Sequence, residues 1–181
     1  MSQSPAPVRR IAVFPGQFDP VTRGHLDVIQ RGTVLFDEVI VGVGNNPDKR
    51  ELFTHDERVA LIEAHLATTP RATVRRYSGL TADFVRDVGA TAILRGIRDV
   101  ADLRYEFQLA LANRAISGVE TVFIMTGDQY ALTSSSLIRQ VVMLGGDPRT
   151  LAALVPDNVV ERLIVWQRSH ARSTEPDAPA T

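Results

Sequence analysis

The stretch Arg10-Ile-Ala-Val-Phe-Pro-Gly-Gln-Phe-Asp-Pro-Val-Thr-Arg-Gly-His25 joins an apolar run to a turn and then to an amphipathic helical pattern. Its first part, Arg10–Phe14, has the composition of a buried strand, and Pro15-Gly16 ends it. Gly24-His25 stands at or near the start of the helix, where free N–H groups and the helix dipole favour an anion. Alone, this pair would be an ordinary cap, but the order of strand, turn and helix predicts one unit of an α/β fold.

Four further apolar runs alternate with helical patterns, at Glu38–Gly44, Thr73–Tyr77, Thr91–Leu94 and Thr121–Met125. Continuous apolar runs are typical of strands buried on both faces, as in a parallel sheet. About five β–α units in sequence therefore predict a right-handed, doubly wound parallel sheet of about five strands.

The ends of the chain differ from its middle, because they are polar, contain proline and lack apolar periodicity. We expect residues 1–8 and 169–181 to be disordered tails around a single domain at residues 9–168.

Three helical signals are specific enough to check. Thr54-His-Asp-Glu57 has the pattern of a capping box, Leu103, Phe107 and Leu111 fall on one face of a helix, and Asp157 can cap the last helix.

The composition of the 181 residues excludes several classes of protein. Twenty Lys and Arg against 21 Asp and Glu give a net charge of −1, which argues against a protein that coats nucleic acid. There is no cysteine, so disulfides and thiolate metal sites are excluded. No apolar run approaches the roughly 20 residues of a membrane span, and Met1–Arg10 lack the apolar core of a secretory signal. We expect a cytoplasmic protein that does not bind or span a membrane.

Groups that can bind anions follow four of the five predicted strands. They are Gly24-His25, Lys49-Arg50, Arg95-Gly-Ile-Arg98 and Thr133-Ser-Ser-Ser136. Each has an ordinary explanation as a cap or a solvated charge. Because ligands of open α/β sheets bind outside the carboxyl ends of the strands, the four together predict a cleft for polyphosphates.

Missing motifs narrow the chemistry. The phosphate-binding GxxxxGK[ST] loop, a GxGxxG turn after the first strand and a GxSxG elbow are all absent, which argues against P-loop enzymes, dinucleotide-dependent dehydrogenases and α/β-hydrolases. The other histidines, His55, His65 and His170, lack a metal-ligand spacing, and we expect no metal ligands from the protein.

These residues resemble a known family. Phe18-Asp-Pro20 and Thr22-x-Gly-His25 resemble the TxGH signature of the nucleotidyltransferase superfamily. With Arg95-Gly-x-Arg98, Asp102-x-x-Tyr-Glu106 and Ser134-Ser-Ser136, the chain from about Ile11 to about Leu163 is similar to the bacterial phosphopantetheine adenylyltransferase family. The resemblance implies a Rossmann-like nucleotidyltransferase fold. It also implies a reversible, direct in-line transfer of the adenylyl group of ATP to 4′-phosphopantetheine, giving dephospho-coenzyme A and pyrophosphate.

The resemblance also implies roles for individual residues, with His25 as the transition-state stabiliser. The implied ATP site comprises Gln17, Phe18, His25, Gly96, Ile97, Arg98, Glu106, Tyr130, Ala131, Leu132, Thr133, Ser134, Ser135 and Ser136. The implied phosphopantetheine contacts are Gln17, Lys49, Thr81 and Arg95. Mg²⁺ carried with ATP, a homohexamer and feedback inhibition by coenzyme A follow from the same resemblance.

Three positions depart from the family pattern. Gln17 stands where Ser or Thr is usual, Gln140 where many members have Glu, and Tyr130 where Trp is common. Two alternatives stay open. Another nucleotidyltransferase with the same TxGH site could act on nicotinamide mononucleotide or a small phospho-alcohol, and the departure at Gln17 is compatible with a nucleotide-binding module that has lost activity. An oligonucleotide-binding protein is disfavoured by the near-neutral charge and the few aromatic residues.

Overall fold

Five parallel strands form the centre of the protein, and their order across the sheet is β3-β2-β1-β4-β5. The computed structural model describes residues 9–45 and 51–171. The strands are β1 (Ile11–Gly16), β2 (Glu38–Val43), β3 (Ala72–Arg76), β4 (Ala92–Ile97) and β5 (Glu120–Met125). The chain crosses from β3 back to β4 beside β1, which makes the sheet doubly wound and confirms the predicted fold class.

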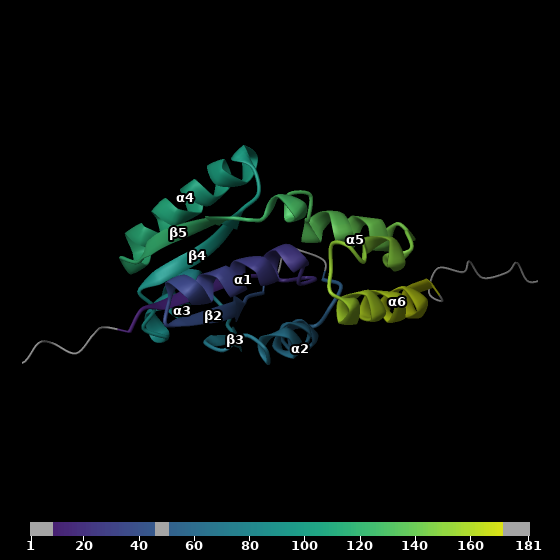
Figure 1. The fold of residues 1–181 in the computed structure, drawn as a ribbon, viewed down its shortest axis with the longest axis horizontal. Helices are drawn as coiled ribbons and strands as arrows, with labels where there is room; N and C mark the ends of the chain where they lie inside the picture. Colours follow the sequence, from purple (N-terminus) through teal and green to yellow (C-terminus); the bar gives the residue numbers. More distant parts are fainter. Residues whose placement is uncertain (1–8, 46–50, 172–181) are drawn as a thin grey trace, which may run out of the picture.

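Helices cover both faces of this sheet (Figure 1). They are α1 (Arg23–Leu35), α2 (His55–Leu66), α3 (Thr81–Asp87), α4 (Val100–Ser117), α5 (Ser135–Met143) and α6 (Asp157–Ala171), with short 3-10 turns η1 (Asp128–Tyr130) and η2 (Pro148–Leu151). Figure 1 shows α5 and α6 packed beside one another at one end of the molecule.

Alternation along the strands divides the core between the two faces. Phe14 and its neighbours on one face pack with α1, α2 and α6 through residues such as Ile29 and Ile62. Val13 on the other face packs with Phe84 of α3. Since both faces of β1 are buried, its continuous apolar run is explained.

Several local predictions need correction. Strand β4 extends to Ile97, so Arg95 and Gly96 lie within the strand rather than after it. The apolar stripe of Leu103, Phe107 and Leu111 is on α4, but these side chains are 42%, 56% and 43% exposed instead of packing inward. The backbone is helical as the spacing predicts, because helix formation follows local pattern whereas burial follows tertiary contacts.

The last helix also differs from the prediction at both ends. Asp157 is the first residue of α6 and pairs with Arg23, so it does not occupy the capping position before the helix. Helix α6 continues through Ala171, so the expected tail at 169–181 begins within the helix. Residues 1–8 and 172–181 lie outside the described residues.

Within the described ranges, no helix is both long enough and apolar enough to pass through a membrane.

Candidate functional site

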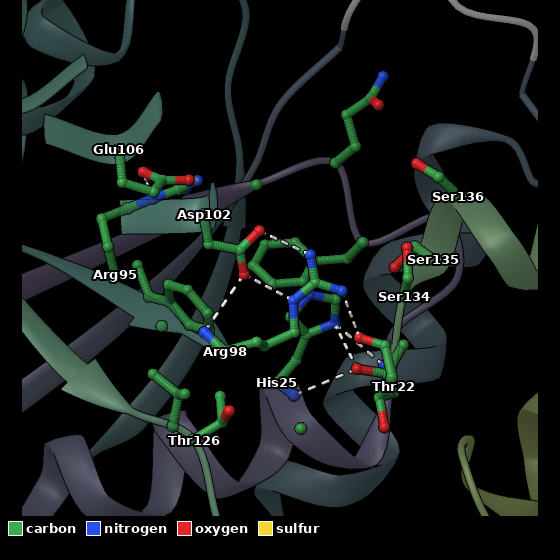
Figure 2. A pocket seen from close by; sticks show the side chains of 18 of the residues that line it. Thr22, His25, Arg95, Arg98, Asp102, Glu106, Thr126, Ser134, Ser135 and Ser136 are labelled. Carbon is green, nitrogen blue, oxygen red and sulfur yellow. Dashed lines mark hydrogen bonds and ion pairs between the residues drawn. The ribbon is translucent and has the colours of Figure 1, made fainter. Parts of the chain in front are cut away.

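A cavity of ≈ 400 Å³ lies where the carboxyl ends of β1 and β4 meet the starts of α1 and α5. Most of the residues predicted for the ATP site line it, namely Gln17, Phe18, His25, Gly96, Arg98, Glu106, Tyr130, Thr133, Ser134, Ser135 and Ser136. Arg95, which was predicted to contact phosphopantetheine, lines it as well. In Figure 2, Arg95 and Glu106 lie on one side of this cavity and the three serines on the other. The residues at or after the carboxyl ends of β1, β4 and β5 therefore lie together, as expected for the ends of parallel strands at one edge of a sheet.

His25 is held by a reciprocal capping box at the start of α1. The Thr22 hydroxyl accepts a hydrogen bond from the His25 N–H at 3.2 Å, and the Thr22 N–H donates to His25 Nδ1 at 3.1 Å (Figure 2). Because Nδ1 is the acceptor of a backbone N–H, the neutral ring carries its proton on Nε2. The local structure thus fixes both the orientation and the tautomer of the imidazole.

The electrostatics of the cavity keep this ring neutral. Burial lowers the pKa of His25 to about 3, and the nearby positive charges of Arg95 and Arg98 add to that effect. At neutral pH the side chain is therefore an uncharged donor that faces the cavity through Nε2. Such a donor can hydrogen-bond a phosphate oxygen without a proton-transfer step.

Arg98 joins the exit of β4 to the segment that precedes α5. Its Nε and Nη2 donate to the two Asp102 carboxylate oxygens at 2.7 and 2.8 Å, and Nη1 donates to the Thr133 carbonyl at 2.8 Å. The hydrogen bonds from Arg98 lower the pKa of Asp102, which keeps this carboxylate ionised. Asp102 thus orients the Arg98 guanidinium, which in turn holds the backbone of Thr133.

The serine segment is fixed against the loop between β1 and α1. Ser134 caps α5, and the Ser135 hydroxyl donates to the Pro20 carbonyl at 2.9 Å. Arg139 Nη1 donates to the Asp19 carbonyl at 2.8 Å, and Nη2 donates to the Ser136 hydroxyl at 3.1 Å. The first N–H groups of α5 consequently border the cavity, with the positive end of the helix dipole.

A second cavity of ≈ 520 Å³ adjoins the first. The two share Pro15, Gly16, Gln17, Arg95, Glu106 and Leu109. The second is bounded further by Tyr77, whose hydroxyl lies 2.9 Å from the Thr81 hydroxyl, and by Asn113. Two ligands could therefore occupy separate cavities and meet at a common border.

An ion pair marks that border. Arg95 Nε donates to Glu106 Oε2 at 2.6 Å, Nη2 pairs with Glu106 Oε1, and Nη1 donates to the Pro15 carbonyl. The bidentate contact fixes the plane of the guanidinium. The Arg95 guanidinium is therefore held in a defined orientation at the border of both cavities, with its charge paired to the Glu106 carboxylate.

The structure separates a few predicted residues from these cavities. Ile97, Ala131 and Leu132 line neither of them. The Ile97 side chain is buried in the core, whereas Leu132 is 84% exposed, so neither side chain is directed at the site. Lys49 and Arg50 lie outside the described residues.

Other residues of the site had no predicted role. Thr22 and Asp19 belong to quoted motifs but were given no function of their own, and Tyr77 and Asn113 carried no signal. The capping pattern Thr22-x-x-His25 could have indicated the role of Thr22, because it has the spacing of a capping box with histidine as its third member.

Comparisons with known proteins agree with this geometry. The Cytidylyltransferase-like family model matches residues 13–141. A phosphopantetheine adenylyltransferase of Geotalea daltonii is 49% identical over 155 residues, which cover 85% of this chain and 94% of that protein. One from Clostridium tetani is 46% identical over 152 residues, covering 83% of this chain and 93% of the relative.

This chain belongs to the phosphopantetheine adenylyltransferase family. It is accordingly a nucleotidyltransferase, as the TxGH segment predicted, and the family is the one that the Arg-Gly-x-Arg and serine segments indicated. Among solved structures, Plasmodium falciparum nicotinic acid mononucleotide adenylyltransferase complexed with NaAD superposes with a TM-score of 0.66 at 16% identity, covering 88% of this chain and 96% of that one. This similarity shows that the phosphopantetheine adenylyltransferase family shares its fold with other adenylyltransferases.

Proposed function

We propose that this chain transfers the adenylyl group of ATP to 4′-phosphopantetheine, giving dephospho-coenzyme A and pyrophosphate in coenzyme A biosynthesis. Two adjoining cavities that share the Arg95–Glu106 pair carry this proposal, because the reaction joins two polyanions. ATP would occupy the cavity of His25, Arg98 and the serine segment. Phosphopantetheine would occupy the cavity of Thr81, Tyr77 and Asn113.

The reaction needs no protein nucleophile. The acceptor is a phosphate monoester with a second pKa near 6, so it is largely dianionic at neutral pH. One of its oxygens forms a bond to the α-phosphorus in line, while the bond from that phosphorus to the bridging oxygen breaks and pyrophosphate leaves with the electron pair. Positioning and charge stabilisation therefore provide the rate acceleration.

Different groups of the site would position the substrates and stabilise the charge that develops. His25 would donate from Nε2 to an α-phosphate oxygen as negative charge accumulates there, which is the role of an oxyanion-hole donor. Arg95 would reduce the repulsion between the two anions at the common border. The N–H groups at the start of α5 would bind phosphate oxygens of the nucleotide.

Mg²⁺ fits the site as a companion of the nucleotide. Within residues 9–45 and 51–171, no three His, Asp or Glu residues come together as a metal cluster. The carboxylates of the first cavity already have partners: Asp19 accepts two backbone N–H groups, Asp102 pairs with Arg98, and Glu106 pairs with Arg95. We propose that the ATP phosphates hold the ion, which neutralises charge on the triphosphate when bound.

Further properties are proposed from the family resemblance. They are a contact of Lys49 with phosphopantetheine, a homohexamer and inhibition by coenzyme A. A cytoplasmic location is proposed separately, from the sequence composition. The substitution Lys49→Ala should raise the KM for phosphopantetheine, and sedimentation of the purified chain measures its assembly.

The function is tested by pyrophosphate release with a panel of acceptors. The purified enzyme should release pyrophosphate from ATP and Mg²⁺ with 4′-phosphopantetheine, at a kcat/KM at least about 100-fold above that with nicotinamide mononucleotide. A comparable rate with nicotinamide mononucleotide, or a rate only with CTP and a phospho-alcohol, contradicts the proposal. ATP binding without pyrophosphate release from any acceptor would indicate a binding module.

A further inference from the structure

Arg58 is buried in an unusual way for an arginine on a helix. It lies in α2, its side chain is 0% exposed, and it heads the fully buried side chains of the described residues by volume. A fully desolvated guanidinium is expensive unless its donors are hydrogen-bonded. Its partners therefore indicate what the burial achieves.

Those partners come from the exits of two neighbouring strands and from the segment before α2. Nη1 donates to the Gln17 carbonyl at 3.0 Å and to the Gly44 carbonyl at 3.1 Å. Nη2 donates to Asn45 Oδ1 at 2.7 Å and to Glu51 Oε1 at 2.8 Å. One rigid group thus ties together the segments that follow β1 and β2.

Three of these partners form part of the second cavity. Gln17, Gly44 and Asn45 line it, whereas Arg58 and Glu51 line neither cavity. Arg58 consequently lies behind the boundary of the cavity and fixes the backbone that forms it. It acts through other residues and has no contact with the cavity itself.

Asp19 supports the same arrangement from the first cavity. Its carboxylate is buried and accepts hydrogen bonds from the N–H groups of Leu52 at 2.8 Å and Phe53 at 3.1 Å. The exit of β1 is therefore joined to Gly44 and Asn45 through Arg58, and to Leu52 and Phe53 through Asp19.

Stability alone is a poor explanation for this arginine. Buried ion pairs often contribute no more than apolar side chains of similar volume, and Arg58 Nε has no hydrogen-bond partner within the described ranges. The planar guanidinium does provide several donors in a fixed geometry, which lysine or an apolar residue cannot reproduce.

We propose that Arg58 is a positioning residue that sets the boundary of the phosphopantetheine cavity by holding the carbonyls of Gln17 and Gly44 and the side chain of Asn45. The inference rests on the proposed function and adds a determinant of acceptor binding. Arg58 contacts Gln17 only through its carbonyl, so this contact does not involve the Gln17 side chain.

The test compares steady-state constants for both substrates in Arg58→Met, Arg58→Lys and wild type. Arg58→Met should raise the KM for phosphopantetheine about 10-fold or more, because charge-assisted hydrogen bonds to the boundary are lost. Arg58→Lys should be intermediate, since an ammonium replaces some of the donors. The KM for ATP should rise much less in both, because Gly44 and Asn45 line only the second cavity and Gln17 alone of these partners also lines the nucleotide cavity.

Two controls separate positioning from general loosening of the fold. Arg162 lies on α6 and forms an ion pair with Glu57 of α2, the helix that carries Arg58, but it lines neither cavity. Arg162→Gln removes this ion pair and should leave both KM values unchanged. If the Arg58 variants do not fold, as judged by near-UV circular dichroism, Glu51→Gln replaces them. It removes the charge of the partly exposed partner and should raise the phosphopantetheine KM about threefold without altering that of ATP.

An unchanged phosphopantetheine KM in the folded variants, or equal increases for both substrates, would overturn the role of Arg58. Failure of the proposed function is distinguishable from this result, because wild type would then release no pyrophosphate with phosphopantetheine.

Discussion

Helices α1 and α2 begin with the same reciprocal capping arrangement but use different residues at its third helical position. In α2, the Glu57 carboxylate accepts from the Thr54 N–H at 2.8 Å, and the Thr54 hydroxyl accepts from the Glu57 N–H at 3.3 Å. In α1, a histidine replaces the glutamate, and Nδ1 takes the place of the carboxylate oxygen.

The surroundings of the two caps explain the difference. Glu57 receives a hydrogen bond from Arg162 of α6 at 3.0 Å, and neither Thr54 nor Glu57 lines either of the two cavities described above. His25 lines the cavity proposed for ATP, where a carboxylate would repel phosphate. The imidazole satisfies the cap with one nitrogen and leaves a neutral donor on the other, so the comparison shows how a structural cap becomes a phosphate-binding group.

Converting the cap of α1 into that of α2 should have the largest effect. We expect His25→Glu to fold, because glutamate preserves the capping box, and to lower kcat by at least about 10³ because it replaces a donor with a negative charge. Steady-state pyrophosphate release and urea unfolding measure the two quantities. A folded variant that retains a tenth of the wild-type kcat would contradict the account.

Removing the ring without adding charge should be less severe. His25→Ala should lower kcat by about 10² to 10³, the usual cost of losing one oxyanion donor, while the far-UV circular dichroism spectrum stays the same. Nearly unchanged turnover would reject the assignment of His25.

Stability should depend on pH through His25. The pKa is about 3 in the folded protein and near the ordinary 6.5 in the unfolded chain. Between these values only the unfolded chain binds the proton, so the free energy of unfolding falls as pH decreases from 6.5 towards 3. Above pH 6.5 neither state binds the proton, so titration of His25 no longer changes the free energy of unfolding with pH.

Urea unfolding of wild type and His25→Asn checks this expectation. Between pH 7.5 and 5, wild type should lose up to about 2 kcal/mol more than the variant, which has no ring to titrate. Equal losses would show that His25 titrates alike in both states.

The hydroxyl of the α1 cap should matter less than the ring. Thr22→Val removes the acceptor for the His25 N–H but retains the Thr22 N–H that bonds Nδ1. We expect about 1 kcal/mol lower stability and at most about a 10-fold lower kcat. A loss as large as that of His25→Ala would mean that the hydroxyl itself orients the ring.

The equivalent change in α2 should affect only stability. Thr54→Val should cost about 1 kcal/mol of unfolding free energy and leave kcat and both KM values within about twofold. A marked loss of turnover would show that the α2 cap also contributes to catalysis, which contradicts its purely structural role in this comparison.

The fold and much of the site could be predicted because their signals are local. Buried strands such as Glu38–Val43 are continuous apolar runs, and the Thr54–Glu57 cap is a four-residue pattern. The arrangement of His25, Arg98 and Ser134 in one cavity follows from the rule that strand ends of a parallel sheet converge.

What could not be predicted depends on contacts distant in the sequence. Arg58 has the sequence context of a solvated helix residue, and its burial is set by carbonyls of Gln17 and Gly44 that only the folded sheet brings near. The exposure of Phe107 is likewise decided by what packs against α4, about which helical periodicity carries no information.

The protonation state of His25 tests the central claim most directly. A two-bond ¹H–¹⁵N correlation spectrum of the free enzyme, recorded from pH 7.5 to 5 and assigned with His25→Asn, distinguishes the two neutral tautomers from the imidazolium. The account predicts a neutral ring with its proton on Nε2 across this range. A ring protonated on Nδ1, or an imidazolium that forms near pH 6.5, would contradict it.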